Sequence, residues 1–127
     1  MQLVAVEPTG CPTYHAAAAA GRPVDVAVGG LASDALGASR IGDSGFASLT
    51  SVSAQSVLVR AESIERVRQL LWDDMRLVVE PGGATALAAL LQGAYVPAAG
   101  EQVAVVVCGA NADLADLTRL TAGVRPR

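Results

Sequence analysis

The sequence predicts an α/β fold, in which helices pack on a short, partial sheet of parallel strands. Segments with strand character alternate with helical segments along the 127 residues. Residues 103–107, Val-Ala-Val-Val-Val, form an apolar run without alternation, which is typical of a strand buried on both faces of a parallel sheet. We expect one unit over residues 1–127. Three short strands are too few to cover such apolar helices, so we expect this unit to be part of a larger one.

The chain opens with a predicted strand and a small helix. Residues 2–6 form a short apolar run that Glu7 and Pro8 stop, and a loop rich in proline and glycine follows. Thr13 can cap an alanine-rich helix over residues 13–20, and Gly21 is placed to end it.

Three weaker segments follow. They are an extended stretch that ends in Gly29-Gly30, a segment of weak helical character, and another short strand, at residues 25–31, 39–49 and 56–59.

The clearest helix has one apolar stripe. The stripe is made by residues at three- and four-residue spacings: Ile64, Val67, Leu71, Met75 and Val78. The remaining face is charged and is expected to be solvated; it carries Glu65, Arg66, Arg68, Asp73 and Asp74. Because the stripe reaches Val78, we expect the helix to continue through residues 75–79. A separate strand there is the alternative.

The last third of the chain predicts a buried helix, a buried strand and a final helix. Residues 80–83 break the preceding helix, and residues 84–91 start one that is apolar all round. The strand over residues 103–108 runs into Gly109, after which Asn111 or Asp113 can cap a helix over residues 114–120. A strand, a glycine turn and a helix N-terminus form the usual place for a polar or anionic ligand at the carboxyl edge of a parallel sheet.

Composition excludes several classes of protein. The net charge of −3, without a local cluster of basic residues, argues against a nucleic-acid partner. The uncharged residues 82–100 contain a glutamine, a proline and several glycines, so we expect no membrane span. Cys11 and Cys108 lack metal-site spacing, and no secretion signal is recognised, so we expect reduced thiols and a cytoplasmic protein.

Some reactive groups are missing. All nine basic residues are arginine, so no lysine can form a Schiff base. Neither a Walker loop nor a GxGxxG fingerprint is present, and no pattern of metal ligands occurs. The single histidine, His15, is best interpreted as a surface or locally hydrogen-bonded residue.

Two residues are candidates for a site. Glu80 stands between two apolar helices, where a carboxylate must find hydrogen-bond donors or face a polar cavity. It can do so by bonding nearby helix N–H groups or by taking part in a site. Cys108 ends the predicted buried strand and can equally be a small core residue.

Four segments together resemble a known family. They read VAVEPTGCPTYHAA, VGGLASDALG, QLLWDDMRLVVEPGGATALAALL and VVVCGAN. In this order and spacing they resemble the C-terminal portion of pyridoxal-phosphate-dependent serine/threonine dehydratases of fold type II, a group that includes serine racemase. The resemblance implies a partial parallel-sheet layer of such an enzyme and the cofactor pyridoxal 5'-phosphate.

The resemblance also implies roles for individual residues. Cys108 matches the Ser or Cys that faces the pyridine nitrogen of the cofactor, and Gly109 and Asn111 complete that motif. Glu80 matches a glutamate close to the cofactor ring. Gly30 matches a glycine of the loop that passes the ring face, although the Asp that usually precedes it is Gly29 here.

Further family features are absent. Glu7 matches one carboxylate of a cation site in racemase-like members, but the second falls near Thr13, so no metal is predicted. The Schiff-base lysine, the motif for the substrate carboxylate and the phosphate-binding loop all lie upstream of the matched segment. No residue of this chain is therefore expected to be catalytic.

The sequence thus predicts the C-terminal fragment of a dehydratase that deaminates serine or threonine to a 2-oxo acid and is inactive alone. Its partner would be a lysine-bearing N-terminal half, or a second copy. The alternative is a non-catalytic binding module that kept the fold without the chemistry.

Overall fold

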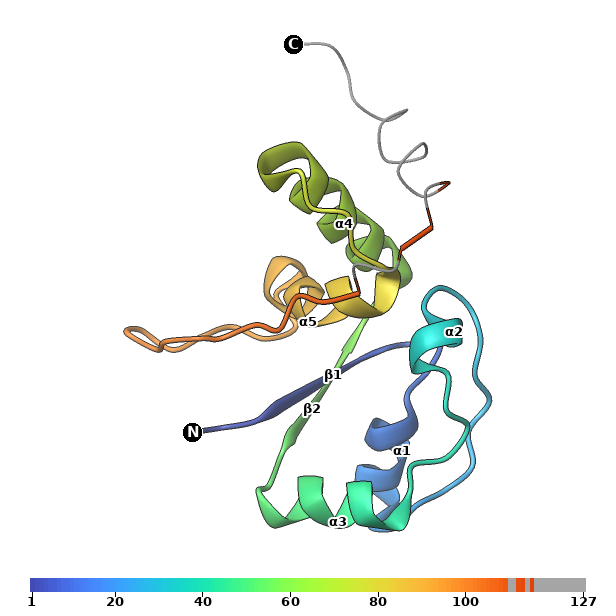
Figure 1. Cartoon of the computed structure of the whole chain (residues 1–127). Coiled ribbons are helices and arrows are strands. Elements are labelled where there is room, and N and C mark those ends of the chain that lie inside the picture. The colour runs from blue at the N-terminus through green and yellow to red at the C-terminus, as the bar shows by residue number, and fades with distance from the viewer. Residues whose placement is uncertain (110–111, 114, 116–127) are drawn as a thin grey trace.

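The computed structural model describes residues 1–109, 112, 113 and 115, and the elements within them are helices and a short parallel sheet (Figure 1). This arrangement confirms the α/β class. In chain order the elements are β1 (Val4–Pro8), α1 (Thr13–Ala20), α2 (Ser33–Leu36), α3 (Asp43–Ser51), β2 (Gln55–Val59), α4 (Ala61–Met75) and α5 (Pro81–Gln92).

The sheet consists of β1 and β2, which pair in parallel from Val4 opposite Gln55 to Pro8 opposite Val59. The connection between the strands carries α1, α2 and α3, as a parallel crossover requires. Figure 1 shows α1 and α3 on one side of the strands and α4 and α5 on the other. The sheet is therefore covered by helices on both faces.

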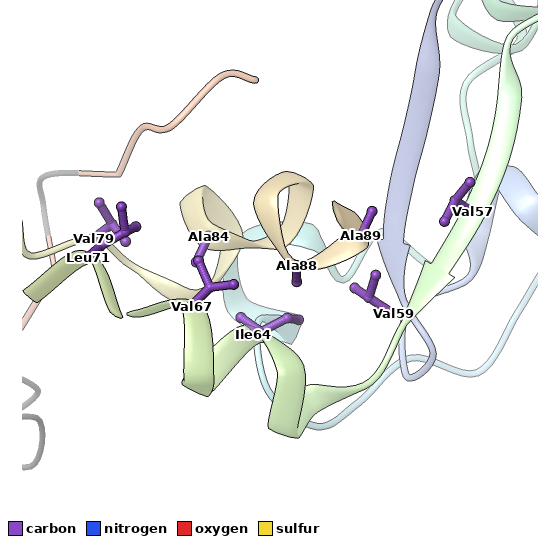
Figure 2. Packing of buried hydrophobic residues seen from close by; sticks show 9 residues of the cluster. All are labelled: Val57, Val59, Ile64, Val67, Leu71, Val79, Ala84, Ala88 and Ala89. Carbon is purple, nitrogen blue, oxygen red and sulfur yellow. The ribbon is translucent and has the colours of Figure 1, made fainter. Parts of the chain in front are cut away.

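The main core lies where α4 and α5 meet β2 (Figure 2). Its larger side chains come from α4 and β2, and α5 contributes alanines: Val57, Val59, Ile64, Val67, Leu71, Val79, Ala84, Ala88 and Ala89. Alanine side chains let the α5 backbone come close to its neighbours. The predicted apolar helix is thus confirmed, but it is buried on one face only, and Leu91 near its end is 48% exposed.

Most of the predicted elements in the first half are confirmed. The helix over residues 13–20 and the strand near residues 56–59 are present, and Gly21 ends α1 in the left-handed conformation with φ 67°. The weak helical segment forms α3, somewhat later in the chain than predicted. The short helix α2 was not predicted.

The predicted continuation of the long helix through residues 75–79 is wrong. Helix α4 ends at Met75, and Arg76 takes the left-handed conformation with φ 56°. The N–H groups of Arg76 and Leu77 donate to the carbonyls of Trp72 and Leu71, which closes the helix end. Met75 is 62% exposed, so the apolar stripe stops being buried one turn earlier than its spacing suggested.

The charge pattern predicted that Arg68 lies on a solvated face, and this prediction is also wrong. Its side chain is 4% exposed and donates from Nε to the carbonyl oxygen of Val79 at 3.0 Å. Its Nη1 donates to Glu65 Oε1, also at 3.0 Å. This buried arginine ties the segment after α4 back onto the helix.

The prediction of a buried strand over residues 103–108 is wrong for this chain. The segment does not pair with a strand of the sheet, and all of its residues except Val105 are exposed. A strand needs a neighbour for its backbone groups, and β1 and β2 pair only with each other within the part of the chain that the structure describes. The predicted helix over residues 114–120 falls outside the described residues.

A polar turn links α5 to this extended segment. The Tyr95 hydroxyl donates to Glu101 Oε1, and the Ala98 N–H donates to Glu101 Oε2 at 2.8 Å. The Tyr95 hydroxyl, with the Ala98 N–H, lowers the pKa of the Glu101 carboxyl, while the bond to Glu101 raises the pKa of Tyr95. The hydrogen bond between Tyr95 and Glu101 is therefore strongest at pH values above the pKa of Glu101 and below the pKa of Tyr95, where the carboxylate is charged and the hydroxyl is protonated. Among the described residues, no helix is long and apolar enough to cross a membrane.

We expect Ile64→Ala to lower the free energy of unfolding by about 2–5 kcal/mol, because it leaves a cavity between α4 and α5. The matched control is Met75→Ala on the same helix, whose exposed side chain should change stability by about 0.5 kcal/mol or less. Urea unfolding followed by circular dichroism measures both. Equal losses would contradict this assignment of the core.

Tyr95→Phe should raise the pKa of Glu101 towards its ordinary value, because the hydroxyl that stabilises the carboxylate is removed. In the unmodified chain the stabilising contribution is present above the ordinary pKa of glutamate and is lost as pH falls through the lowered one. A carbon-detected NMR titration of the Glu101 carboxyl tests this. An unchanged pKa in the variant would refute it.

Candidate functional site

The candidate site lies at the N-terminus of α5, where residues 108 and 109 cross the helix end. Glu80 is the N-cap residue, and Pro81 takes the first helical position, where its missing N–H costs nothing. The Glu80 N–H donates to the carbonyl oxygen of Gly109 at 2.9 Å. This bond connects two predicted site residues that are 29 positions apart.

Two glycines make this crossing possible. A Cβ atom on Gly83 would collide with the backbone carbonyl of Cys108, and a Cβ atom on Gly109 would collide with the Glu80 side chain. Gly109 also has φ 79°, a conformation that side chains disfavour. The glycines are therefore needed for close approach as well as for turning.

A third segment reaches the same helix end through α2. A Cβ atom on Gly82 would lie 3.1 Å from Ala35 Cβ, so α2 packs directly on the first turn of α5. Gly30 begins the approach to α2, and its carbonyl oxygen accepts the Ser33 N–H at 3.2 Å. With φ 82° Gly30 is left-handed, and the space where its Cβ would lie is open.

The Glu80 carboxylate is half-buried, and within the described residues no group donates a hydrogen bond to it. The alternative in which nearby helix N–H groups hold this carboxylate is thus not seen there. The Glu80 oxygens are not among the buried, unpartnered atoms of the described residues, so they reach solvent. Glu80 is therefore suited to meet a bound polar group.

Cys108 is an exposed free thiol, so its interpretation as a small core residue is wrong. The core thiol is Cys11, which is buried and points its Sγ towards the Gly29 carbonyl oxygen, 3.7 Å away. The structure thus brings Glu80, Cys108 and Gly109 together. It places the Gly30 loop against the same helix through α2. Asn111 lies outside the described residues, and the role of all five in cofactor binding stays a prediction.

Glu7 contacts the start of α1, whereas the resemblance matched it to one carboxylate of a cation site. Its two carboxylate oxygens accept the N–H groups of Tyr14 and His15 at 2.7 and 2.8 Å, so it caps α1. Thr13 is not the cap: it is the first helical residue, and its hydroxyl donates to the Ala38 carbonyl. Sequence spacing could not reveal this, because the capping side chain comes from a strand.

The remaining questions from the sequence concern His15 and possible metal ligands. His15 Nδ1 lies 3.0 Å from Ser56 Oγ, which agrees with a locally hydrogen-bonded histidine. Among the described residues, no group of three or more His, Cys, Asp and Glu side chains could hold a metal ion.

The site offers a neutral thiol, a carboxylate and an open glycine backbone around one helix end. A thiol can share a hydrogen bond with an aromatic nitrogen without a full charge. A covalent anchor for an aldehyde would have to come from elsewhere, because the chain has no lysine.

Comparison with known proteins finds related chains. The model of a family described as pyridoxal-phosphate dependent enzyme matches residues 1–109. Phenylserine dehydratase of Ralstonia pickettii is 31% identical over 118 residues, covering 93% of this chain and 36% of that protein. The biosynthetic L-threonine dehydratase IlvA of Salmonella typhimurium is 33% identical over 114 residues, covering 87% and 22%.

Solved structures show the same fold. Threonine deaminase isoform 2 from Solanum lycopersicum superposes with a TM-score of 0.81 at 24% identity, over 98% of this chain and 37% of that one. Maize serine racemase gives 0.79 at 25% identity, over 95% and 38%. The chain thus spans between about a fifth and two fifths of the length of the relatives it matches.

Gly83→Ala should detach residues 108 and 109 from α5, because the added Cβ collides with the Cys108 carbonyl. The Glu80 amide should then exchange with deuterium faster, since its acceptor is Gly109. Alanine is the better helix former by about 1 kcal/mol, so a net loss of stability would come from the collision.

The matched control is Gly45→Ala in α3, whose Cβ would make an ordinary contact 3.6 Å from Ile41. It should leave exchange at Glu80 unchanged. If both variants show the same exchange rate at the Glu80 amide, the close contact at Gly83 does not hold residues 108 and 109 on α5.

Proposed function

Because the chain belongs to the family of pyridoxal-phosphate-dependent enzymes, we propose that it is the C-terminal part of an L-serine or L-threonine dehydratase. It would supply one side of the cofactor pocket for a β-elimination that ends in a 2-oxo acid and ammonia. The observation that carries the proposal is the meeting of Glu80, Cys108 and Gly109 at the start of α5. The curated relatives that are dehydratases support the reaction class.

Each residue would have a defined task. Pyridoxal phosphate, when bound, supplies the electron sink for the reaction, and the protein tunes it through the groups around the ring. The Cys108 thiol would face the pyridine nitrogen and leave it without the full proton that an aspartate would hold there. Glu80 would border the ring, and the open space at Gly30 would admit the ring face.

The chain would be inactive by itself. With no lysine it has neither the covalent anchor for the cofactor nor the usual base for the α-proton. The proposal therefore requires a lysine-bearing portion, joined to this chain or separate from it. We place the assembly in the cytoplasm, where the free thiols of Cys11 and Cys108 would stay reduced.

A second candidate function is a non-catalytic binding module. The observation that favours it is the set of exposed apolar side chains near the chain start and in the extended segment, among them Leu3, Val103 and Val106. Such side chains favour association with another surface. In this case the cofactor residues would be remnants, and pyridoxal phosphate would not bind specifically.

We expect the purified chain to bind pyridoxal phosphate saturably, as followed by absorbance. Borohydride reduction and intact mass should show no covalent adduct beyond the Met1 amine, because there is no lysine. Cys108→Ala should weaken binding by about threefold to tenfold, the usual worth of one hydrogen bond.

Cys108→Ser is the matched control, since it keeps a neutral hydrogen-bonding group and should bind nearly as well as the unmodified chain. Binding that does not saturate, or that is indifferent to Cys108→Ala, would favour the binding module over the half-pocket.

A further inference from the structure

Among the described residues, Arg68 of α4 is the only charged side chain that is buried, with 4% of its surface exposed. Its Nε donates to the carbonyl oxygen of Val79, and its Nη1 donates to Glu65 Oε1, both at 3.0 Å. The ion pair with Glu65 joins neighbouring turns of one helix, and a surface arginine could make it equally well. The bond to Val79 is the contact that reaches out of the helix.

Val79 lies in the short connection between α4 and α5. Because α4 ends at Met75 and α5 begins at Pro81, the Val79 carbonyl is outside the hydrogen bonding of both helices. Val79 is 6% exposed, and Figure 2 shows its side chain at one end of the core. A buried carbonyl needs a hydrogen-bond donor, and in the described part of the chain Arg68 provides it. Arg68 therefore holds this connection in place.

The peptide unit that Arg68 holds is the one that leads into Glu80. Its carbonyl belongs to Val79, and its N–H belongs to Glu80 and donates to the carbonyl oxygen of Gly109 at 2.9 Å. Because a peptide unit is planar, a partner that fixes its oxygen also fixes the direction of its N–H. A charged donor on the oxygen also polarises the unit and strengthens the bond that the N–H makes. One peptide unit thus connects Arg68 to the segment that crosses α5.

The position of residues 108 and 109 depends on that N–H. The other contact at this crossing, between Gly83 and the Cys108 carbonyl, is close packing. Close packing allows the segment to lie there, whereas a hydrogen bond also sets its distance and direction. Since Cys108 directly precedes Gly109, a shift of the Val79–Glu80 peptide would move Cys108 as well.

We propose that Arg68 is a positioning residue for the candidate site. It acts through the Val79–Glu80 peptide: the guanidinium fixes the carbonyl, and the N–H of the same unit fixes Gly109 and with it Cys108. Its effect on the cofactor rests on the proposed function, in which Glu80 and Cys108 border pyridoxal phosphate.

Two substitutions separate this role from a general contribution to stability. Arg68→Met puts a methyl group at about the place of Nε, so the donor to Val79 is lost. Arg68→Gln keeps a donor there, because its amide nitrogen and the arginine Nε both follow Cβ, Cγ and Cδ. Both variants lose the guanidinium and its ion pair with Glu65. Lysine is unsuitable, because it would add a Schiff-base amine to a chain without lysine.

The first measurement is amide hydrogen exchange of the full chain without cofactor. In Arg68→Met the Glu80 amide should exchange about tenfold faster, the usual worth of one hydrogen bond. The rate is taken relative to the Thr9 amide, which donates to the Val59 carbonyl at the sheet, so that a change in overall stability cancels. In Arg68→Gln the relative rate should stay within about twofold of the unmodified chain.

Arg66→Met is the matched control, because Arg66 lies on the same helix and is exposed. It makes the same chemical change without touching the Val79 carbonyl, so the relative rate at Glu80 should again stay within about twofold. Pyridoxal phosphate binding, followed by absorbance, is the second measurement. Binding should weaken about threefold to tenfold in Arg68→Met and remain within twofold in the other two variants.

Three results would overturn the inference. They are equal exchange at Glu80 in the Met and Gln variants of Arg68, faster exchange that Thr9 shares, and saturable cofactor binding that Arg68→Met leaves unchanged. If the unmodified chain shows no saturable binding, the proposed function fails, and exchange at Glu80 alone decides whether Arg68 positions the segment.

NMR couplings across hydrogen bonds keep the inference testable if Arg68→Met does not fold. The unmodified chain should show one coupling between Arg68 Nε and the Val79 carbonyl carbon, and another between the Glu80 nitrogen and the Gly109 carbonyl carbon. Arg68→Gln should preserve the second coupling. Absence of either coupling in the unmodified chain would refute the role of Arg68.

Discussion

The structure depends on the close approach of α5 to everything around it. This helix packs against α4, both strands and α2, and residues 108 and 109 cross its first turn. Such crowding is possible because the residues of α5 at its closest contacts are mostly glycine and alanine, namely Gly82, Gly83, Ala84, Ala88 and Ala89. Larger side chains would push the neighbours apart, and both the core and the candidate site would be lost together.

The candidate site is a by-product of that packing. A helix of small residues brings the backbone of Cys108 onto its N-terminus, and the Glu80 side chain lies against Gly109, the next residue. The value of Glu80 and Cys108 lies in position: Glu80 is fixed by its N–H bond to Gly109, and Cys108 precedes that glycine. A cofactor with its own reactive group needs this kind of orientation from the protein.

Long-range side chains also decide where the helices begin. Glu7 of β1 caps α1, and Gln92 at the end of α5 accepts the Arg60 N–H and the Ser63 hydroxyl at the start of α4. Both caps come from residues distant in sequence. Secondary structure in this chain is therefore stabilised by tertiary contacts, which agrees with a sheet that has two strands within the described residues.

Local sequence patterns were enough to predict the fold class, the strands near residues 4 and 57, the helix of Ile64, Val67 and Leu71, and the alanine-rich helix, because periodicity and glycine placement act locally. The four resembling segments also led to the correct family. Only the tertiary structure decided that residues 103–108 stay unpaired, that Arg68 is buried, and that Glu7 is a cap. A strand exists only through a neighbouring strand, and a buried charge only through the partners that fold around it, so neither can be inferred from its own stretch of sequence.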